Sequence, residues 1–383
     1  MEKRKTALYD IHLAEGAEMI DLFGWALPQQ YPEGSAAEHL WDRGACSLCD
    51  FSHLSRIAVS GADALALLQR VLTSNVAALE PGRAQYGILS SESGCALDEA
   101  YLYGVGENAY FFVGNAAVRE QTVDYLREQS RGQRVTVRDE TLQTAAIAVQ
   151  GPRSEALLKA LFGNLDFLGH RKGSFGCVER EGRRLWVGRT GYTGDPVGFE
   201  VYTETCDAPW LWERLRAMGA KPAGLGARDS LRIEAGLPHF GQEYGLDRDG
   251  AELPIFAVPL ARFAVHFAEK GDFTGRETLT RQREHLTRRI VPVAGLDGTL
   301  TEGADLLCRG EPVGYVTSAA AAPCPETGGL RYIGLACVAA GISAGAALTL
   351  RSGGRVQVVE RHLRNDMGPI ARPVLPDGTT AGW

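Results

Sequence analysis

The sequence predicts an α+β protein that ends in an all-β domain. Strand-like and helix-like segments alternate over residues 57–129, with hairpin-length links between strands, which is typical of a mainly antiparallel sheet covered by helices. A second segment of similar design begins near residue 145. Beyond residue 286, glycine interrupts short Val/Ala/Leu runs roughly every eight to ten residues, which predicts a small barrel or sandwich.

Size and composition indicate a globular protein of several domains. The chain has 383 residues, of which 45% are hydrophobic and 23% charged. We expect no membrane span and no signal peptide, because no long apolar run occurs. The net charge of -7 argues against a general nucleic-acid binder. Eight scattered cysteines suit reduced thiols in the cytoplasm, and the lone pair Cys46 and Cys49 lacks the partners of a metal site.

Helices and strands follow from apolar spacing and from glycine positions. We expect an entry strand or turn and then a hairpin over 6–24. Further helices are expected over 34–43, 61–72, 117–129, 154–162, 210–218 and 223–236, and from 271 onward. Further strands are expected over 55–61, 86–89, 97–103, 110–114, 145–150, 185–187 and 199–202, and a polar extended tail over 364–383.

A glycine-rich turn, Arg189 to Gly194, lies between two of these strands and leads to Glu200. Its glycines would let the backbone approach a flat ligand. Tyr192 could stack on that ligand, and Glu200 could pair with adjacent N–H donors. The alternative is a hairpin whose turn has no function.

Two further charged residues have both a functional and a structural interpretation. Asp98 lies among apolar and aromatic neighbours, so its carboxylate either is buried with a partner or faces a cavity. Alternatively it faces solvent, since one of Asp98 and Glu99 must point away from the core. Arg228 follows a glycine-rich turn and could bind an anion, or it could join a helix face of salt bridges.

These landmarks together resemble the T-protein (aminomethyltransferase) family of the glycine cleavage system, over about residues 6–360. The matching segments include Gly24-Trp25, Asp50-Phe51-Ser52-His53, Ala84-Gln85-Tyr86, Leu97-Asp98, Asn115-Ala116, Gln150-Gly151-Pro152, Arg189 to Gly194, Gly198-Phe199-Glu200, Gly224 to Gly236 and Gly271-Asp272-Phe273.

The resemblance implies a three-domain cloverleaf with tetrahydrofolate in its central hole. Two domains would be mainly antiparallel α+β units and the third a C-terminal β-barrel or jelly roll. The implied boundaries are a discontinuous folate-binding domain over 1–50 and 145–250, a ferredoxin-like domain over 51–144, a connecting segment over 251–285, the barrel over 286–363 and the tail over 364–383.

The resemblance also implies roles for individual residues. Asp98 matches the catalytic aspartate, and Glu200 would hold the pterin ring. The implied folate-binding positions are Tyr86, Phe111, Asn115, Tyr192, Glu200 and Arg228. Phe111 lacks the hydroxyl of the tyrosine that the family often has there.

Departures from the family cluster where donor substrates would differ. Leu54-Ser55-Arg56 replaces the usual Met-Gly-Glu, and Phe263 stands in place of a pocket tryptophan, which makes Leu54 and Phe263 the predicted substrate-side residues. The resemblance implies aminomethyl transfer from a lipoyl carrier protein to tetrahydrofolate, giving methylenetetrahydrofolate and ammonia. The alternatives are a folate-dependent methyltransferase or demethylase of a free small molecule, and a non-enzymatic folate-binding factor for iron–sulfur assembly. Neither nucleic acid, membrane nor metal is expected as a partner.

Overall fold

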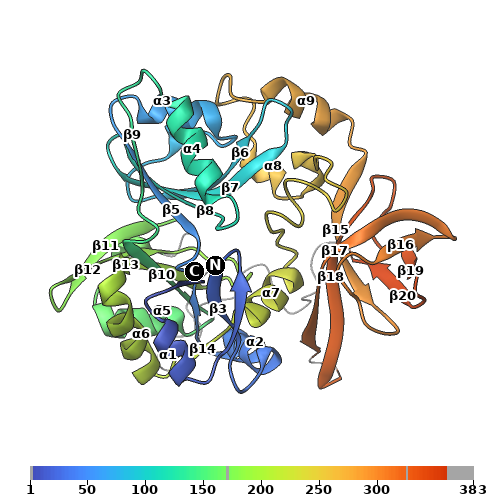
Figure 1. Cartoon of the computed structure of the whole chain (residues 1–383), viewed down its shortest axis with the longest axis horizontal. Helices are drawn as coiled ribbons and strands as arrows, with labels where there is room; N and C mark the ends of the chain where they lie inside the picture. Colours follow the sequence, from blue (N-terminus) through green and yellow to red (C-terminus); the bar gives the residue numbers. More distant parts are fainter. Residues whose placement is uncertain (1–2, 170–171, 325–326, 360–383) are drawn as a thin grey trace.

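The computed structural model describes residues 3–169, 172–324 and 327–359, so the predicted tail 364–383 lies outside the described residues. Three lobes surround a common centre (Figure 1). The first carries a six-stranded sheet, the second a five-stranded sheet and the third a closed barrel. The cavity described below lies where these lobes meet.

The six-stranded sheet has the order β11-β12-β13-β10-β4-β14. Its pairings are antiparallel except between β4 and β14. The strands are β4 (Ser47–Asp50), β10 (Thr144–Gln150), β11 (Phe175–Arg180), β12 (Arg183–Gly188), β13 (Gly198–Glu204) and β14 (Lys221–Pro222). Helices α1 (Tyr9–Ala14), α5 (Ser154–Phe162) and α6 (Ala208–Ala217) bury one face.

Strand alternation divides the residues of this sheet between two environments. Ile147 and Val201 pack under the helices, whereas Ala148 and Tyr202 turn to the opposite face. That opposite face meets the second lobe through Tyr103, which lies 5.6 Å from Tyr202 between ring centroids. The sheet therefore presents an aromatic surface to the centre of the molecule.

The five-stranded sheet has the order β6-β7-β8-β5-β9, and all its pairings are antiparallel. The strands are β5 (Ser55–Ser60), β6 (Ala84–Ser90), β7 (Ala96–Gly106), β8 (Ala109–Gly114) and β9 (Thr136–Asp139). Helices α3 (Ala64–Val71) and α4 (Arg119–Gln129) cover one face with an apolar core. Its other face turns toward the centre.

The N-terminal segment forms a three-stranded sheet of β1 (Arg4–Lys5), β3 (Trp25–Gln30) and β2 (Glu18–Leu22). Helix α7 (Leu225–Glu234) packs against α2 (Ser35–Gly44), β3 and the barrel. The barrel consists of β15 (Arg288–Gly295), β16 (Asp305–Cys308), β17 (Glu311–Cys324), β18 (Gly329–Ala339), β19 (Ala347–Leu350) and β20 (Arg355–Val358). Helices α8 (Ala261–Ala264) and α9 (Arg276–Glu284) precede it.

Two local expectations were wrong. Residues 9–14 form helix α1 before the hairpin, because Leu8 and His12 are one turn apart and are buried together beneath the six-stranded sheet. Asp98 and Glu99 do not divide between core and solvent, since both are buried. Each face of β7 is covered, one by α4 and the other by the segment around Phe240.

Candidate active site

Two connected cavities occupy the centre of the molecule. The inner cavity, of about 60 Å³, is lined by Phe51, Leu54, Tyr86, Glu99, Ala100, Tyr101, Val113, Gly114, Asn115, Tyr192, Glu200, Arg228 and His239. The outer cavity, of about 420 Å³, shares Leu54, Asn115, Arg228 and His239 with it. Together they lie within the usual ligand-pocket range of ~300–1,000 Å³.

Glu200 is held rigidly at the wall of the inner cavity. Its Oε2 accepts hydrogen bonds from Thr190 (2.6 Å), Tyr103 (2.9 Å) and Tyr202 (3.1 Å). No hydrogen bond to Oε1 is recorded from the residues that the structure describes. One carboxylate oxygen is thus fixed while the other is available to a donor in the cavity.

The glycine-rich turn places Tyr192 at the same cavity. The Tyr192 hydroxyl donates to the carbonyl of Pro238, and the Arg228 guanidinium carbon lies 5.9 Å from the ring centroid. A Cβ at Gly191 would lie 2.1 Å from Oε1 of Gln150, and one at Gly194 would lie 2.1 Å from the Ala235 methyl. These glycines therefore permit close packing within the protein, a different reason from the approach of a flat ligand.

Glu99, and not Asp98, faces the inner cavity. Glu99 Oε2 accepts a hydrogen bond from the Tyr86 hydroxyl, and Oε1 accepts one from the Phe240 amide at 3.2 Å. Burial raises the pKa of Glu99 to about 7. Asp98 lies on the opposite face of β7, where Thr122 of α4 donates to its Oδ2 at 2.9 Å. Asp98 does not line either cavity.

Asp98 instead positions Asn115. Its Oδ1 accepts hydrogen bonds from the Asn115 amide side chain (2.8 Å) and backbone (3.2 Å) and from the Glu99 backbone (2.8 Å). Burial raises the pKa of Asp98 to about 6. Asn115 lines both cavities, so Asp98 acts on the site through it.

Sequence reasoning missed Glu99, although a signal for it exists. Glu99, Tyr101 and Tyr103 alternate along β7, and the two tyrosines extend an aromatic row toward the six-stranded sheet. An acid in register with that row belongs to the same face. What the alternation alone does not reveal is which face of the sheet meets the ligand cavity.

Unpartnered polar atoms lie where the two cavities join. Arg228 Nε and His53 Nδ1 are buried without a hydrogen-bond partner among the described residues. Burial lowers the pKa of Arg228 and lowers that of His53 to about 3, so the imidazole is neutral at pH 7. Burial likewise lowers the pKa of His239, which lines both cavities. Such atoms are suited to hydrogen-bond a ligand.

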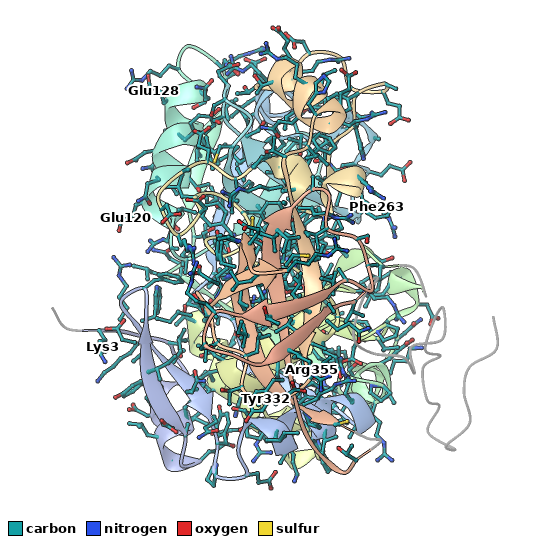
Figure 2. All side chains as sticks on the ribbon, turned by 90° about the vertical axis from the view of Figure 1, so that its right-hand side faces the viewer. Lys3, Glu120, Glu128, Phe263, Tyr332 and Arg355 are labelled. Atoms are coloured by element: carbon teal, nitrogen blue, oxygen red, sulfur yellow. The ribbon has the colours of Figure 1, made fainter. Side chains whose placement is uncertain are left out.

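The structure brings some of the other predicted residues to the site and leaves some away from it. Tyr86 and Leu54 line the inner cavity, and Leu54 lines the outer one as well. Phe111 lines neither cavity, and its ring lies 5.3 Å from that of Tyr202. Phe263 lines neither cavity and is 76% exposed on α8, on the right-hand side of the molecule in Figure 2.

Fold and site together define a three-lobed α+β protein whose central cavity offers carboxylates, tyrosines and a guanidinium to a flat polar ligand. The chain matches the family described as GCVT N-terminal domain over residues 8–256. It is 40% identical to an aminomethyltransferase of Rubrobacter xylanophilus over 338 residues, covering 88% of this chain and 87% of the relative. An aminomethyltransferase of Moorella thermoacetica is 38% identical over 362 residues, or 93% of each chain.

A solved structure agrees with these similarities. The crystal structure of glycine cleavage system aminomethyltransferase T from Bartonella henselae superposes with a TM-score of 0.84 at 27% identity, covering 94% of this chain and 97% of that one. The chain belongs to the glycine cleavage T-protein, or aminomethyltransferase, family. The predicted family, fold class and transferase class are thereby confirmed. Within the described ranges, every helix is too short or too polar to span a membrane.

Proposed function

We propose that the protein transfers an aminomethyl group from a lipoyl carrier protein to tetrahydrofolate, giving methylenetetrahydrofolate and ammonia. In this reaction the bond between the carrier sulfur and the methylene carbon breaks. The sulfur returns to the thiol, and the amine nitrogen leaves as ammonia. Tetrahydrofolate supplies the nitrogens that accept the one-carbon unit. Family membership over most of the chain and the free Oε1 of Glu200 support the proposal.

The polar and aromatic side chains of the inner cavity suit the flat end of such a ligand. Glu200 would accept hydrogen bonds from ring N–H donors through Oε1, while its other oxygen stays fixed by three hydroxyls. Tyr86 and Tyr192 would line the ring, and Asn115, held by Asp98, would offer its amide beside it. Phe111, which has no hydroxyl, would pack against the Tyr202 ring and would not contact the ligand.

Glu99 would hold or move a proton at the reacting end of the cavity. A group whose pKa is near the working pH is the most effective general acid or base, and the pKa of Glu99 is about 7. Tyr86 donates to the same carboxyl and would keep it oriented. In this proposal Glu99 is the catalytic carboxyl and Asp98 is a positioning residue.

Where the cavities join, Arg228, His53 and His239 would contact the donor. A neutral imidazole can accept a proton or a hydrogen bond from an amine, which a charged one cannot. The His53 ring is neutral, and its Nδ1 has no protein partner among the described residues. The outer cavity would therefore receive the carrier-borne amine.

The departures from the family give no reason to replace the proposed one-carbon donor. Arg56 is buried and donates to the carbonyls of Leu54 (2.6 Å), Ser52 (2.9 Å) and Thr144 (3.0 Å), so it braces a loop behind the site. Of the two predicted substrate-side residues, Leu54 lines the cavities and Phe263 does not. We therefore retain the aminomethyl donor.

The test is a reaction of the whole chain with tetrahydrofolate and an aminomethyl-loaded lipoyl carrier. Formation of methylenetetrahydrofolate and ammonia in equal amounts is the expected result. A panel of methylated amines, ethers and thioethers without the carrier serves as the comparison. Turnover of a free methylated substrate, with none from the carrier, would refute the proposal.

A further inference from the structure

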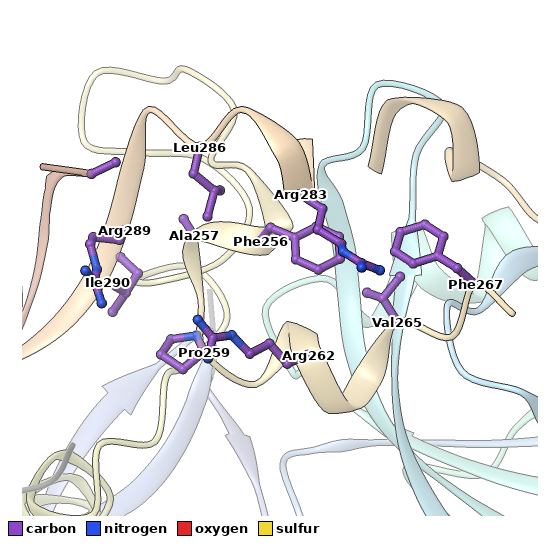
Figure 3. A pocket seen from close by; sticks show the side chains of 11 residues that line it. Phe256, Ala257, Pro259, Arg262, Val265, Phe267, Arg283, Leu286, Arg289 and Ile290 are labelled. Atoms are coloured by element: carbon purple, nitrogen blue, oxygen red, sulfur yellow. The ribbon is translucent and has the colours of Figure 1, made fainter. Parts of the chain in front are cut away.

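A third cavity lies outside the candidate active site, between α8, the end of α9 and the start of the barrel (Figure 3). Its volume is about 560 Å³, which is within the usual range for a small-molecule pocket. None of its lining residues lines the inner or the outer cavity. We call it the arginine pocket, after Arg262, Arg283 and Arg289 in its wall.

The three arginines come from three different elements. Arg262 belongs to α8, Arg283 to α9 and Arg289 to β15. None of their side chains forms an ion pair or hydrogen bond with another residue in the part of the chain that the structure describes. By contrast, two other arginines of the barrel lobe are paired. Arg351 lies 2.7 Å from Asp305, and Arg355 lies 2.6 Å from Asp297.

The three arginines are solvent-exposed, and together they give the pocket a positive potential that attracts anions. Like charges that line one cavity repel each other, and no acidic residue among those described lines the pocket. Guanidinium groups bind carboxylates and phosphates with paired, parallel hydrogen bonds. The three guanidinium groups are therefore available to an anionic ligand with more than one negative group.

The floor of the pocket is aromatic and flat. The rings of Phe256 and Phe267 stack with an interplanar angle of 11° and centroids 5.9 Å apart. The Arg283 guanidinium carbon lies 5.6 Å from the Phe267 centroid, and Figure 3 shows its side chain extending past Phe256 toward Phe267. Val265 is buried beside them. Such a floor favours an unsaturated ring on the ligand as well as its charges.

We propose that the arginine pocket is a second ligand site, which binds an organic anion carrying at least two carboxylate or phosphate groups on a flat ring system. Segment 256–263, which departs from the family pattern, contributes Phe256, Pro259 and Arg262 to this pocket. The departure thus creates a site apart from the folate cavity. The proposal does not depend on the identity of the one-carbon donor.

Isothermal titration calorimetry on the full chain tests the site with two probes. Benzene-1,3,5-tricarboxylate represents carboxylate ligands, and adenosine triphosphate represents phosphate ligands. Citrate provides charge without a ring, and adenosine provides a ring without charge. We expect at least one probe to bind one-to-one, at least ~10-fold more tightly than citrate and adenosine, because both charge and ring contribute.

Two variants test whether the probe binds in the arginine pocket. Arg262→Gln and Arg289→Gln should each weaken the probe by about 10-fold or more, as expected for the loss of a charge-assisted hydrogen bond. Arg281→Gln is the matched control, because it removes an exposed α9 arginine that lies outside the pocket. Binding of neither probe, equal binding by the Arg262 and Arg289 variants, or equally tight binding of citrate would each overturn the proposal.

Discussion

Replacement of Glu99 by glutamine should remove most of the catalytic rate and leave the fold intact. The amide keeps the size of the carboxyl and can still accept a hydrogen bond from the Phe240 amide. The Tyr86 hydroxyl lies 3.4 Å from that of Tyr244, which offers it another partner. The variant therefore loses a group that can transfer a proton, while the Phe240 amide and the Tyr86 hydroxyl keep hydrogen-bond partners.

The size of the effect follows from the state of the carboxyl. With a pKa of about 7, Glu99 is about half ionised at pH 7, so it can both accept and release a proton. Loss of a positioned general acid or base typically costs ~10²–10⁴ in rate, or about 3–5 kcal/mol of barrier. We expect Glu99→Gln to fall within this range.

The assay is single-turnover formation of methylenetetrahydrofolate across pH 5–9, with tetrahydrofolate affinity measured by calorimetry. The wild-type rate should change with an inflection near pH 7, and the Glu99→Gln rate should lack that inflection. Affinity for tetrahydrofolate should change by less than ~10-fold, since in the proposed function Glu200 would supply the main carboxylate contact. A wild-type rate in Glu99→Gln would refute the assignment.

Asp98→Asn is the matched control on the neighbouring residue. Its rate should stay within about 10-fold of wild type, because Asp98 contacts Asn115 and α4 and no cavity. If this variant lost the rate while Glu99→Gln kept it, the roles of the two acids would have to be exchanged.

The stability of the wild type relative to Asp98→Asn should fall as the pH rises. Burial raises the pKa of Asp98 from 3.8 to about 6 in the folded state. A raised carboxyl pKa contributes stability that is present below pH 3.8 and lost as the pH rises through 6. At ~1.4 kcal/mol per pH unit, the wild type should lose about 2.4 kcal/mol relative to the variant between pH 4 and pH 7. Urea unfolding at both pH values measures this difference, and a constant difference would contradict it.

Three further changes test other parts of the site. Glu200→Gln should weaken tetrahydrofolate binding by about 10- to 100-fold in calorimetry, whereas Glu204→Gln, at the exposed end of the same strand, should not; equal affinities would place the ring elsewhere. Arg232→Leu should lower the free energy of unfolding by about 3–5 kcal/mol in thermal unfolding, because it leaves Glu243 buried without its 3.0 Å partner. Adding Glu243→Leu should restore much of that stability. An Arg232→Leu variant as stable as the wild type would rule out this buried pair as a stabilising contact. His53→Asn should raise the KM for the loaded carrier by about 10-fold without changing tetrahydrofolate affinity, and the reverse pattern would move His53 to the folate side.

Local pattern was sufficient for much of the fold. Helix α5 begins and ends at the predicted residues, and β5, β8, β10 and β13 differ from expectation by one or two residues. These elements have strong apolar periodicity and end at glycine or at polar residues. Helix α1 was missed because it is short, and its burial depends on the distant Asp50, whose Oδ2 lies 3.0 Å from His12 Nε2.

The sequence by itself determined most of the elements, the family, and the presence of Glu200, Tyr192 and Arg228 around one cavity. It did not determine which acid of the pair Asp98 and Glu99 faces that cavity, because adjacent strand residues differ only in the face they occupy. Nor did it place Phe263, whose distance from the cavity depends on how segment 251–285 crosses between lobes. The tertiary structure decided both, since the cavity exists only where three lobes meet and each face of β7 has a different neighbour.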